Sequence, residues 1–356
     1  KLGHEVIIFH PWRVNPLRQD VYAYYGVVEN FRIVTLPSID FLWLGFGERF
    51  FFLLQLFSFS TFVALWLLVR YGWWGGLRDA FIFSHDHVPL FFASFFAPRL
   101  FYDIHHYPEH SRLYSRVLKR AIGIGVQTKW KGGAMGKDFG IPPEKIVYWP
   151  NGTDVERFDI PLSLREAREK LKLPQDRKIV LYAGSLQKWK GAETLMMAAK
   201  LLPDAFVYIV GGEHKDTERF RGMIHESRVM NIVLVGQRPW AEIPIWLKAA
   251  DVLVLPNTGR MKVSQYYTSP MKLFEYMASG RPIVASDIPS IREVVDESMV
   301  LFATPDNPRS FADAIRQALA NLGEAKRRIA HARQEVAQYT WEARAQRILS
   351  HLGLQF

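Results

Sequence analysis

Twelve short runs of apolar, often β-branched residues recur along the 356-residue chain, separated by segments with the spacing of helices. The first six runs are 4–9, 32–36, 80–84, 100–104, 122–127 and 145–150, and the second six are 178–184, 205–211, 231–236, 251–256, 281–286 and 299–303. Continuous apolar runs of this length are typical of strands buried on both faces of a parallel sheet. The alternation of strands and helices therefore predicts an α/β fold with right-handed crossovers.

The two series of six strands predict two Rossmann-like domains. A turn signal at Asn151-Gly152 and the polar stretch after it mark the junction. We place the N-terminal domain at 1–157 and the second domain at 158–339, and expect a final helix at 340–356 to pack back on the first domain. The chain starts at Lys1 with a turn and a strand and has no initiator Met, so we expect an N-terminal piece, including the first strand, to be missing.

Residues 50–69 carry no charge across twenty positions, which is long enough for a helix that crosses a bilayer. Strand-like runs stand on both sides of this stretch. If the runs at 4–9, 32–36, 80–84 and 100–104 share one sheet, a crossing would divide that sheet. We therefore expect a buried helix or one that lies on a membrane surface, with a transmembrane helix as the alternative.

The formal charge of +10 favours anionic partners. Arg112, Arg116, Lys119 and Arg120 share one predicted helix, and the aromatic residues around 50–69 are Phe51, Phe52, Trp66, Trp73 and Trp74. Apolar insertion combined with basic residues is typical of peripheral attachment to an anionic membrane. The alternative is a helix that fills the core, with solvated arginines. The charge also suggests nucleic acid, but no recognition motif is present, so we expect no nucleic-acid partner.

Cysteine is absent, which excludes disulfides and thiolate metal sites and fits a reducing compartment. We expect a cytoplasmic protein, attached at most to the inner face of the cytoplasmic membrane.

The first motif follows the strand at 178–184 and reads Gly184-Ser185-Leu186-Gln187-Lys188-Trp189-Lys190-Gly191. Glycines allow the backbone to approach a ligand closely, and the helix that follows presents its N-terminal N–H groups to a phosphate. Lys188 and Lys190 add positive charge against a diphosphate. The alternative is an ordinary strand–helix loop with solvated lysines.

The second motif is the predicted helix within Thr268–Pro282. Ser269 is expected to be the N-cap, Pro270 to occupy the first turn and Gly280 to end the helix. Met271, Phe274, Met277 and Ala278 are expected to face inward. Lys272 and Glu275 are three residues apart and share another face. There a carboxylate can accept both hydroxyls of a ribose; the alternative is a surface ion pair.

Together the two motifs resemble the family-4 retaining glycosyltransferases, which have the GT-B fold with two Rossmann-like domains facing each other across a cleft. Gly184, Leu186, Lys190 and Gly191 match the family's Gly-Arg-Leu-x-x-x-Lys-Gly loop, with Ser185 in place of arginine. Glu275 matches the second of two glutamates eight residues apart, and the first is replaced by Tyr267. The resemblance continues through Asn151–Asp154, Ala250–Val252 and Tyr339–Glu342.

The resemblance implies that Gly184, Ser185 and Lys190 contact the donor diphosphate and that Glu275 binds the ribose. The amides around Ser269, Pro270 and Met271 would hold phosphate and sugar. Because the usual arginine is absent, we expect Lys188 or Lys272 to supply the second positive charge.

Histidines follow two strands of the N-terminal half: His85 and His87 after the first, His105 and His106 after the second. The resemblance implies that His105 contacts the donor sugar. His-x-His beside carboxylates is also a metal-ligand pattern. The family works without a bound metal and no Asp-x-Asp motif occurs, so we expect no metal and no cofactor. His85 and His106 can equally be ordinary core or surface histidines.

These features predict a retaining glycosyltransferase, with catalytic roles for His105 and Lys190. It would move a sugar from a nucleoside-diphosphate sugar to a glycan or lipid-linked acceptor, as in polysaccharide biosynthesis. The alternatives are a non-catalytic nucleotide-sugar-binding protein and a GT-B nucleotide-sugar epimerase.

Overall fold

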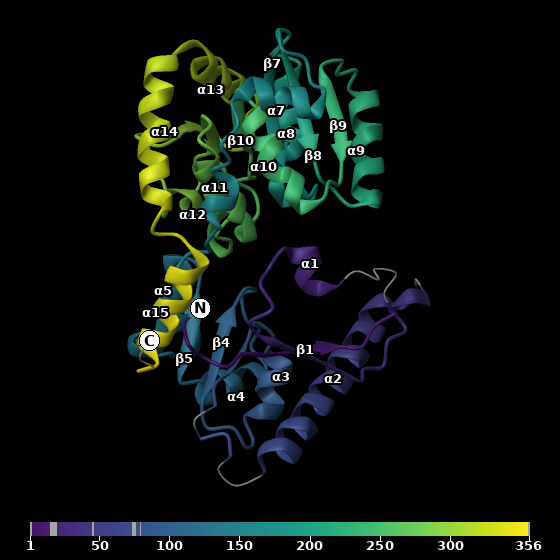
Figure 1. Cartoon of the computed structure of the whole chain (residues 1–356), viewed down its shortest axis with the longest axis vertical. Helices are drawn as coiled ribbons and strands as arrows, with labels where there is room; N and C mark the ends of the chain where they lie inside the picture. The colour runs from purple at the N-terminus through teal and green to yellow at the C-terminus, as the bar shows by residue number, and fades with distance from the viewer. Residues whose placement is uncertain (1, 15–19, 45, 73–75, 79, 355–356) are drawn as a thin grey trace. The chain divides into compact units, whose positions relative to one another are not determined.

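The computed structural model describes residues 2–14, 20–44, 46–72, 76–78 and 80–354; Trp73 and Trp74 lie outside this part. All twelve predicted strands are present and all pairings printed between them are parallel, which confirms the α/β class. The chain forms two compact units (Figure 1). Unit 1 comprises Lys1–Val126, Gly132–Tyr148 and Arg347–Phe356, and unit 2 comprises Gln127–Lys131 and Trp149–Gln346.

The boundary between the units, at 148/149, lies nine residues before the domain boundary predicted at 157/158. Hydrogen bonds from this segment to unit 2 explain the difference. The backbone N–H of Asn151 donates to the Ser269 side chain, and that of Thr153 to the Tyr339 carbonyl. These bonds place the segment after Tyr148 in unit 2. At the other end, α15 (Trp341–His351) carries Ile348, which packs with Phe101 in unit 1.

Unit 2 contains one six-stranded sheet in the order β12-β11-β10-β7-β8-β9. The strands are β7 (Lys178–Ala183), β8 (Ala205–Val210), β9 (Ile232–Gly236), β10 (Val252–Leu255), β11 (Ile283–Ser286) and β12 (Leu301–Ala303). Successive side chains of β7 point to opposite faces, as strand geometry requires. Ile179 and Leu181 enter one buried cluster and Val180 and Tyr182 the other, so the sheet has a core on each face.

Helices cover both faces of this sheet. They are α6 (Val155–Phe158), α7 (Leu164–Leu171), α8 (Ala192–Ala199), α9 (His214–Glu226), α10 (Ile243–Ala249), α11 (Met271–Ser279), α12 (Pro289–Arg292), α13 (Pro308–Ala320) and α14 (Leu322–Val336). The chain runs from β7 outward to β9, then returns to β10 on the other side of β7 and runs outward to β12. This reversal is the topological switch point, where ligands of doubly wound sheets bind at the carboxyl ends of the strands.

Unit 1 holds two parallel sheets rather than one. β1 (Ile7–Pro11) pairs with β2 (Arg32–Leu36), and the second sheet has the order β3-β4-β5-β6. Its strands are β3 (Ile82–Ser84), β4 (Leu100–Ile104), β5 (Gly123–Val126) and β6 (Ile146–Tyr148). The runs before and after the long apolar helix therefore do not share a sheet. Side chains from both sheets instead join one buried cluster.

That long helix is α2 (Glu48–Tyr71), and it is apolar on two faces. Ser60, Val63, Ala64 and Leu67 follow i, i+3, i+4, i+7 spacing and are buried. Outside this buried stripe, α2 exposes apolar side chains, including Phe50, Phe57, Leu65 and Val69. By length and hydropathy α2 could cross a membrane, although one face packs in the core of unit 1. The remaining helices of unit 1 include α1 (Val21–Tyr25), α3 (His87–Ala93), α4 (Arg112–Arg120) and α5 (Lys129–Phe139), the last of which begins in unit 2.

Candidate functional site

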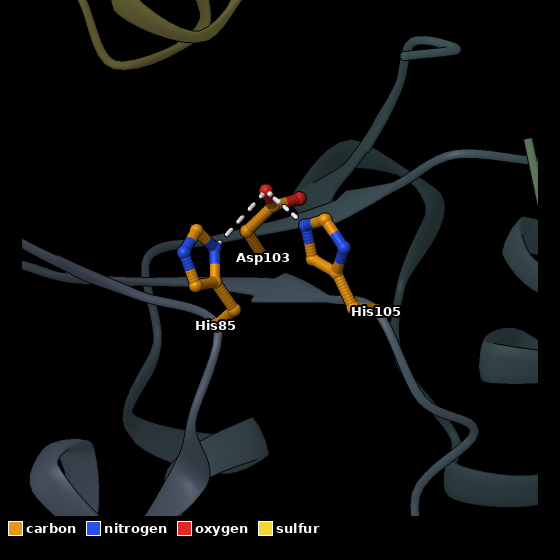
Figure 2. Close-up of side chains that lie close together, drawn as sticks. All are labelled: His85, Asp103 and His105. Carbon is orange, nitrogen blue, oxygen red and sulfur yellow. Dashed lines mark hydrogen bonds and ion pairs between the residues drawn. The ribbon is translucent and has the colours of Figure 1, made fainter. Parts of the chain in front are cut away.

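In unit 1, the ends of β3 and β4 bring two histidines to one carboxylate (Figure 2). Ser84 and Tyr102 are paired in register, so the residues that follow them, His85 and Asp103, emerge at the same edge of the sheet. The Asp103 side chain is fully buried, and its Oδ2 lies 3.1 Å from His105 Nε2 and 3.8 Å from His85 Nδ1.

The ligand-type atoms of these three residues all lie within 4.8 Å of one another, so the cluster could hold a metal ion. The absence of a metal stays a prediction from the sequence. His105 has an exposed ring that is anchored by a hydrogen bond to Asp103. This arrangement suits a side chain that contacts a ligand with a fixed ring orientation.

In unit 2, the predicted phosphate loop follows β7 and leads through the 3-10 turn η3 (Lys188–Lys190) into α8. Gly191 is the N-cap of α8 with φ of +69°, in the left-handed region. A Cβ added to Gly191 would lie 1.9 Å from the carbonyl oxygen of Pro256, directly after β10. Glycine is therefore required because the loops after β7 and β10 touch at the switch point.

The second predicted motif forms α11, which ends at Gly280 in a left-handed conformation as expected. Two details of the prediction are wrong. The N-cap is Pro270 and not Ser269, because the Ser269 hydroxyl and carbonyl both accept hydrogen bonds from Asn151. Met271 is exposed rather than inward-facing, because the buried face of α11 is formed by Leu273, Phe274, Tyr276, Met277 and Ala278.

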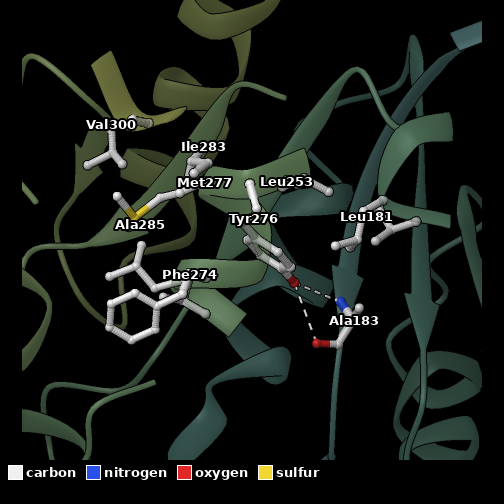
Figure 3. Packing of buried hydrophobic residues seen from close by; sticks show 14 of the residues in the cluster. Leu181, Ala183, Leu253, Phe274, Tyr276, Met277, Ile283, Ala285 and Val300 are labelled. Atoms are coloured by element: carbon white, nitrogen blue, oxygen red, sulfur yellow. Dashed lines mark hydrogen bonds between the residues drawn. The ribbon is translucent and has the colours of Figure 1, made fainter. Parts of the chain in front are cut away.

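Tyr276 fixes α11 over the end of β7 (Figure 3). Its hydroxyl oxygen lies 2.9 Å from the Ala183 nitrogen, which donates to it, and 3.5 Å from the Ala183 carbonyl oxygen. Ala183 directly precedes Gly184, the first residue of the loop. The tyrosine therefore sets the distance between the two predicted motifs, which are about 90 residues apart in sequence.

Lys190, Lys272 and Glu275 form one electrostatic cluster at this edge. Burial lowers the pKa of Lys190 to about 6, helped by the nearby Lys272 and opposed by Glu275. Burial also lowers the pKa of Lys272 to about 8, opposed by Glu275. The pKa of Glu275 is raised by burial and held down in part by both lysines. Two lysine side chains and one glutamate side chain thus share a poorly solvated site.

Lys272 lies directly against the backbone of Gly184. A Cβ at Gly184 would be 1.7 Å from Lys272 Nζ, so any other residue at this position would displace the ammonium group. Lys188 is exposed on η3, whereas the charge of Lys272 contributes to lowering the pKa of Lys190. Of the two lysines expected to supply the second positive charge, the geometry favours Lys272. Ser185 accepts a hydrogen bond from the Tyr182 hydroxyl through its carbonyl.

The loop after β10 was missing from the sequence-based site. Asn257 is almost fully buried, and within the described part of the chain no hydrogen bond to its Oδ1 is found. Thr258 and Gly259 bond to the two carboxylate oxygens of Asp306, at 2.6 and 2.9 Å. A polar Asn-Thr-Gly turn directly after a buried strand was the signal that could have indicated this loop.

Comparison with known proteins identifies the second unit. Residues 164–335 match the sequence model of the family "Glycosyl transferases group 1". The C-terminal unit belongs to this family. The match lies entirely within unit 2 and includes both predicted motifs.

Curated relatives are also glycosyltransferases by name. The chain is 29% identical over 224 residues to D-inositol 3-phosphate glycosyltransferase of Xylanimonas cellulosilytica, covering 59% of this chain and 52% of that protein. It is 27% identical over 247 residues to phosphatidyl-myo-inositol mannosyltransferase of Mycobacterium tuberculosis, covering 67% of this chain and 60% of that protein. The matched part thus spans little more than half the length of these relatives.

Solved structures extend the likeness to the whole chain. Sucrose-phosphate synthase from Thermosynechococcus elongatus aligns with a TM-score of 0.78 and 22% identity, covering 99% of this chain and 89% of that one. Anabaena HepE, solved with UDP and glucose, aligns with a TM-score of 0.71 and 16% identity, covering 98% and 100%. These neighbours are glycosyltransferases of the GT-B class, and the chain has the GT-B fold.

Proposed function

We propose that the chain is a retaining glycosyltransferase that transfers a sugar from a nucleoside-diphosphate sugar to a glycan or lipid-linked acceptor. The observation that carries the proposal is the cluster of Lys190, Lys272 and Glu275 at the switch point of unit 2. The names of the relatives, and the UDP-glucose bound to Anabaena HepE, support a nucleotide-sugar donor.

In this proposal Lys190 and Lys272 hold the donor diphosphate, together with the N–H groups at the start of α11, and Glu275 accepts the ribose hydroxyls. The bond from the anomeric carbon to the phosphate oxygen breaks, and a bond to the acceptor oxygen forms on the same face. The acceptor proton passes to the leaving diphosphate. The lysines stabilise the charge that develops on that phosphate, and His105 contacts the sugar.

The test uses the purified chain with a panel of nucleotide sugars, first for thermal stabilisation and then for turnover. We expect release of nucleoside diphosphate only when an acceptor is present, and a product with the anomeric configuration of the donor by proton NMR. Conversion of the donor without acceptor would indicate an epimerase. Binding without any turnover, across donors and acceptors, would indicate a non-catalytic binding protein.

We further propose that unit 1 attaches to an anionic membrane, where a lipid-linked acceptor would be found. The exposed face of α2 continues into α3, because the rings of Phe57 and Phe92 are in contact with centroids 6.3 Å apart. Arg116 of α4 stacks 3.9 Å above the ring of Phe95, directly after α3. An apolar helix and a basic helix thus belong to one continuous surface, which matches the two requirements of peripheral binding.

Basic side chains dominate the α4 part of this surface. His110, Arg112, Arg116, Lys119 and Arg120 border a hollow of about 630 Å³ without an acidic side chain among its lining residues. Each basic residue near an anionic surface contributes about 1 kcal/mol.

Co-sedimentation with vesicles tests the surface directly. We expect binding that needs anionic lipid and is reversed by high salt. Replacing Lys119 and Arg120 by glutamate should abolish it. The same replacement of Lys326 and Arg327, an exposed Lys-Arg pair on α14 of unit 2, should leave it intact. Binding that resists both salt and carbonate would indicate a transmembrane helix, and no binding at low salt would exclude the surface.

A further inference from the structure

Asp103 is a charged residue that the proposed reaction does not yet use. It is the fourth residue of β4, and its side chain is completely buried although two exposed histidines adjoin it. A buried carboxylate is costly unless hydrogen bonds compensate for its lost solvation. Such a residue needs a structural or functional explanation.

The neighbouring strand β5 confines this carboxylate on one side. A Cβ added to Gly125 of the neighbouring strand β5 would lie 2.6 Å from Asp103 Oδ1. Glycine at this position leaves the space that the carboxylate fills. Asp103 Oδ1 therefore lies against the β5 backbone, and Oδ2 points toward the histidines (Figure 2).

The two histidines do not share the carboxylate equally. His105 Nε2 is 3.1 Å from Oδ2, which is hydrogen-bond distance, whereas His85 Nδ1 is 3.8 Å away, which is too long. The His85 ring packs edge-on against the His105 ring with centroids 4.8 Å apart. His85 thus limits rotation of His105, and Asp103 sets which nitrogen faces inward.

We infer that Asp103 is a positioning residue that holds His105 in the tautomer with the proton on Nε2. In a neutral imidazole the other nitrogen is then an acceptor, so Nδ1 can accept a hydrogen bond from a sugar hydroxyl. This inference rests on the proposed contact between His105 and the donor sugar. It adds a specific chemical requirement, namely a ring that accepts at Nδ1 and does not donate there.

Asparagine in place of Asp103 keeps the size of the side chain but removes the charge. Its amide can turn NH₂ toward the ring, which favours the opposite tautomer. We expect Asp103→Asn to lower kcat about tenfold with a smaller effect on the donor KM, since it misorients one hydrogen-bond acceptor at the sugar. His106→Ala, an exposed histidine in the same loop, is the matched control.

The experiment compares Asp103→Asn, His105→Ala and the double variant, with ¹⁵N NMR of the histidine rings in the unmutated chain. We expect an Nε2-protonated His105 signal that disappears in His105→Ala. We also expect no further loss of kcat when Asp103→Asn is added to His105→Ala, because residues that act as one unit are non-additive.

Two results would overturn the inference. One is an Nδ1-protonated His105 in the unmutated chain, which does not depend on any variant folding. The other is an equal loss of kcat from Asp103→Asn in both backgrounds, which would indicate a role in folding alone. If His105→Ala keeps full activity, the proposed contact of His105 with the sugar fails instead, and the NMR result still decides the tautomer.

Discussion

At the scale of single residues, the candidate site combines groups whose pKa values are displaced in opposite directions. The pKa of Lys190 is lowered to about 6 and that of Glu275 is raised, both mainly by burial. Ionisable groups placed in a poorly solvated position are costly for folding and are therefore characteristic of functional sites.

Replacing Lys190 by methionine should separate stability from binding. We expect nucleotide-sugar affinity to fall about tenfold or more, since a charge-assisted hydrogen bond contributes roughly 1.5–3 kcal/mol. Thermal stability should rise, because the lowered pKa means that burial opposes the charged form. This cost is complete below about pH 6 and disappears toward pH 10.5, so the gain in Tm should be larger at pH 6 than at pH 9.

Calorimetry and thermal melts at both pH values measure these effects. Lys188→Met, an exposed lysine of the same turn, is the matched control and should change neither quantity much. A loss of stability without a loss of affinity would contradict the assignment.

Donor binding should also depend on pH. A lysine with a pKa of about 6 is mostly neutral at pH 8, and a bound diphosphate favours its charged form, so binding must take up a proton. We expect the affinity for a nucleotide sugar, whose diphosphate does not titrate in this range, to fall by up to about tenfold per pH unit above pH 6. Calorimetry in buffers of different ionisation enthalpy measures the uptake directly, and Lys190→Met should abolish it. An affinity that is flat from pH 6 to 8 would contradict this prediction.

At the scale of elements, the site depends on contacts between segments that are distant in sequence. The loop after β7 touches the loop after β10 at Gly191, and α11 is tied to β7 through Tyr276. Since these contacts define where Lys190 and Lys272 stand, small changes of backbone at the switch point should affect binding as well as folding.

A pair of glycine substitutions tests this dependence. Gly191→Ala places a Cβ against Pro256 at a left-handed position, and that backbone conformation alone costs about 1–2 kcal/mol. Gly222 lies inside α9 with open space around its Cβ position, so Gly222→Ala should stabilise the same unit by about 0.5–1 kcal/mol. Chemical denaturation measures both. Equal effects of the two substitutions would show that the contact between the loops is unimportant.

At the scale of the whole molecule, the family match and the structural match cover different lengths. The family match is confined to unit 2, whereas the GT-B likeness extends over both units. The two predicted motifs lie within the family match, and the cluster around Asp103 lies outside it.

Among the described residues, one group of three possible metal ligands is found, His85, Asp103 and His105, and it belongs to unit 1. We expect glycosyl transfer to continue in EDTA, since in the proposed function Lys190 and Lys272 supply the positive charge that a divalent ion otherwise contributes. Activity with and without chelator measures this. Loss of activity in EDTA with recovery on adding Mn²⁺ or Mg²⁺ would show that a metal is required.

The sequence by itself determined the strands, their class and the positions of the loop after β7 and of α11, because these follow from local patterns. Apolar runs specify buried strands, and Gly280 ends α11 as its backbone freedom predicts. Glu275 and Lys272 could be placed on one helix face from their spacing alone.

Only the tertiary structure decided how these segments meet. Ser269 accepts a hydrogen bond from Asn151 instead of capping α11, and Met271 is exposed. The strands of unit 1 are divided between two sheets, and the Asp103 carboxylate contacts the ring of His105. The tertiary structure also brought Lys272 to Gly184, close enough to Lys190 to lower its pKa. Apart from the contact between Asp103 and His105, which are two residues apart, these outcomes depend on partners that are far apart in the chain, and helical or strand periodicity describes only neighbours.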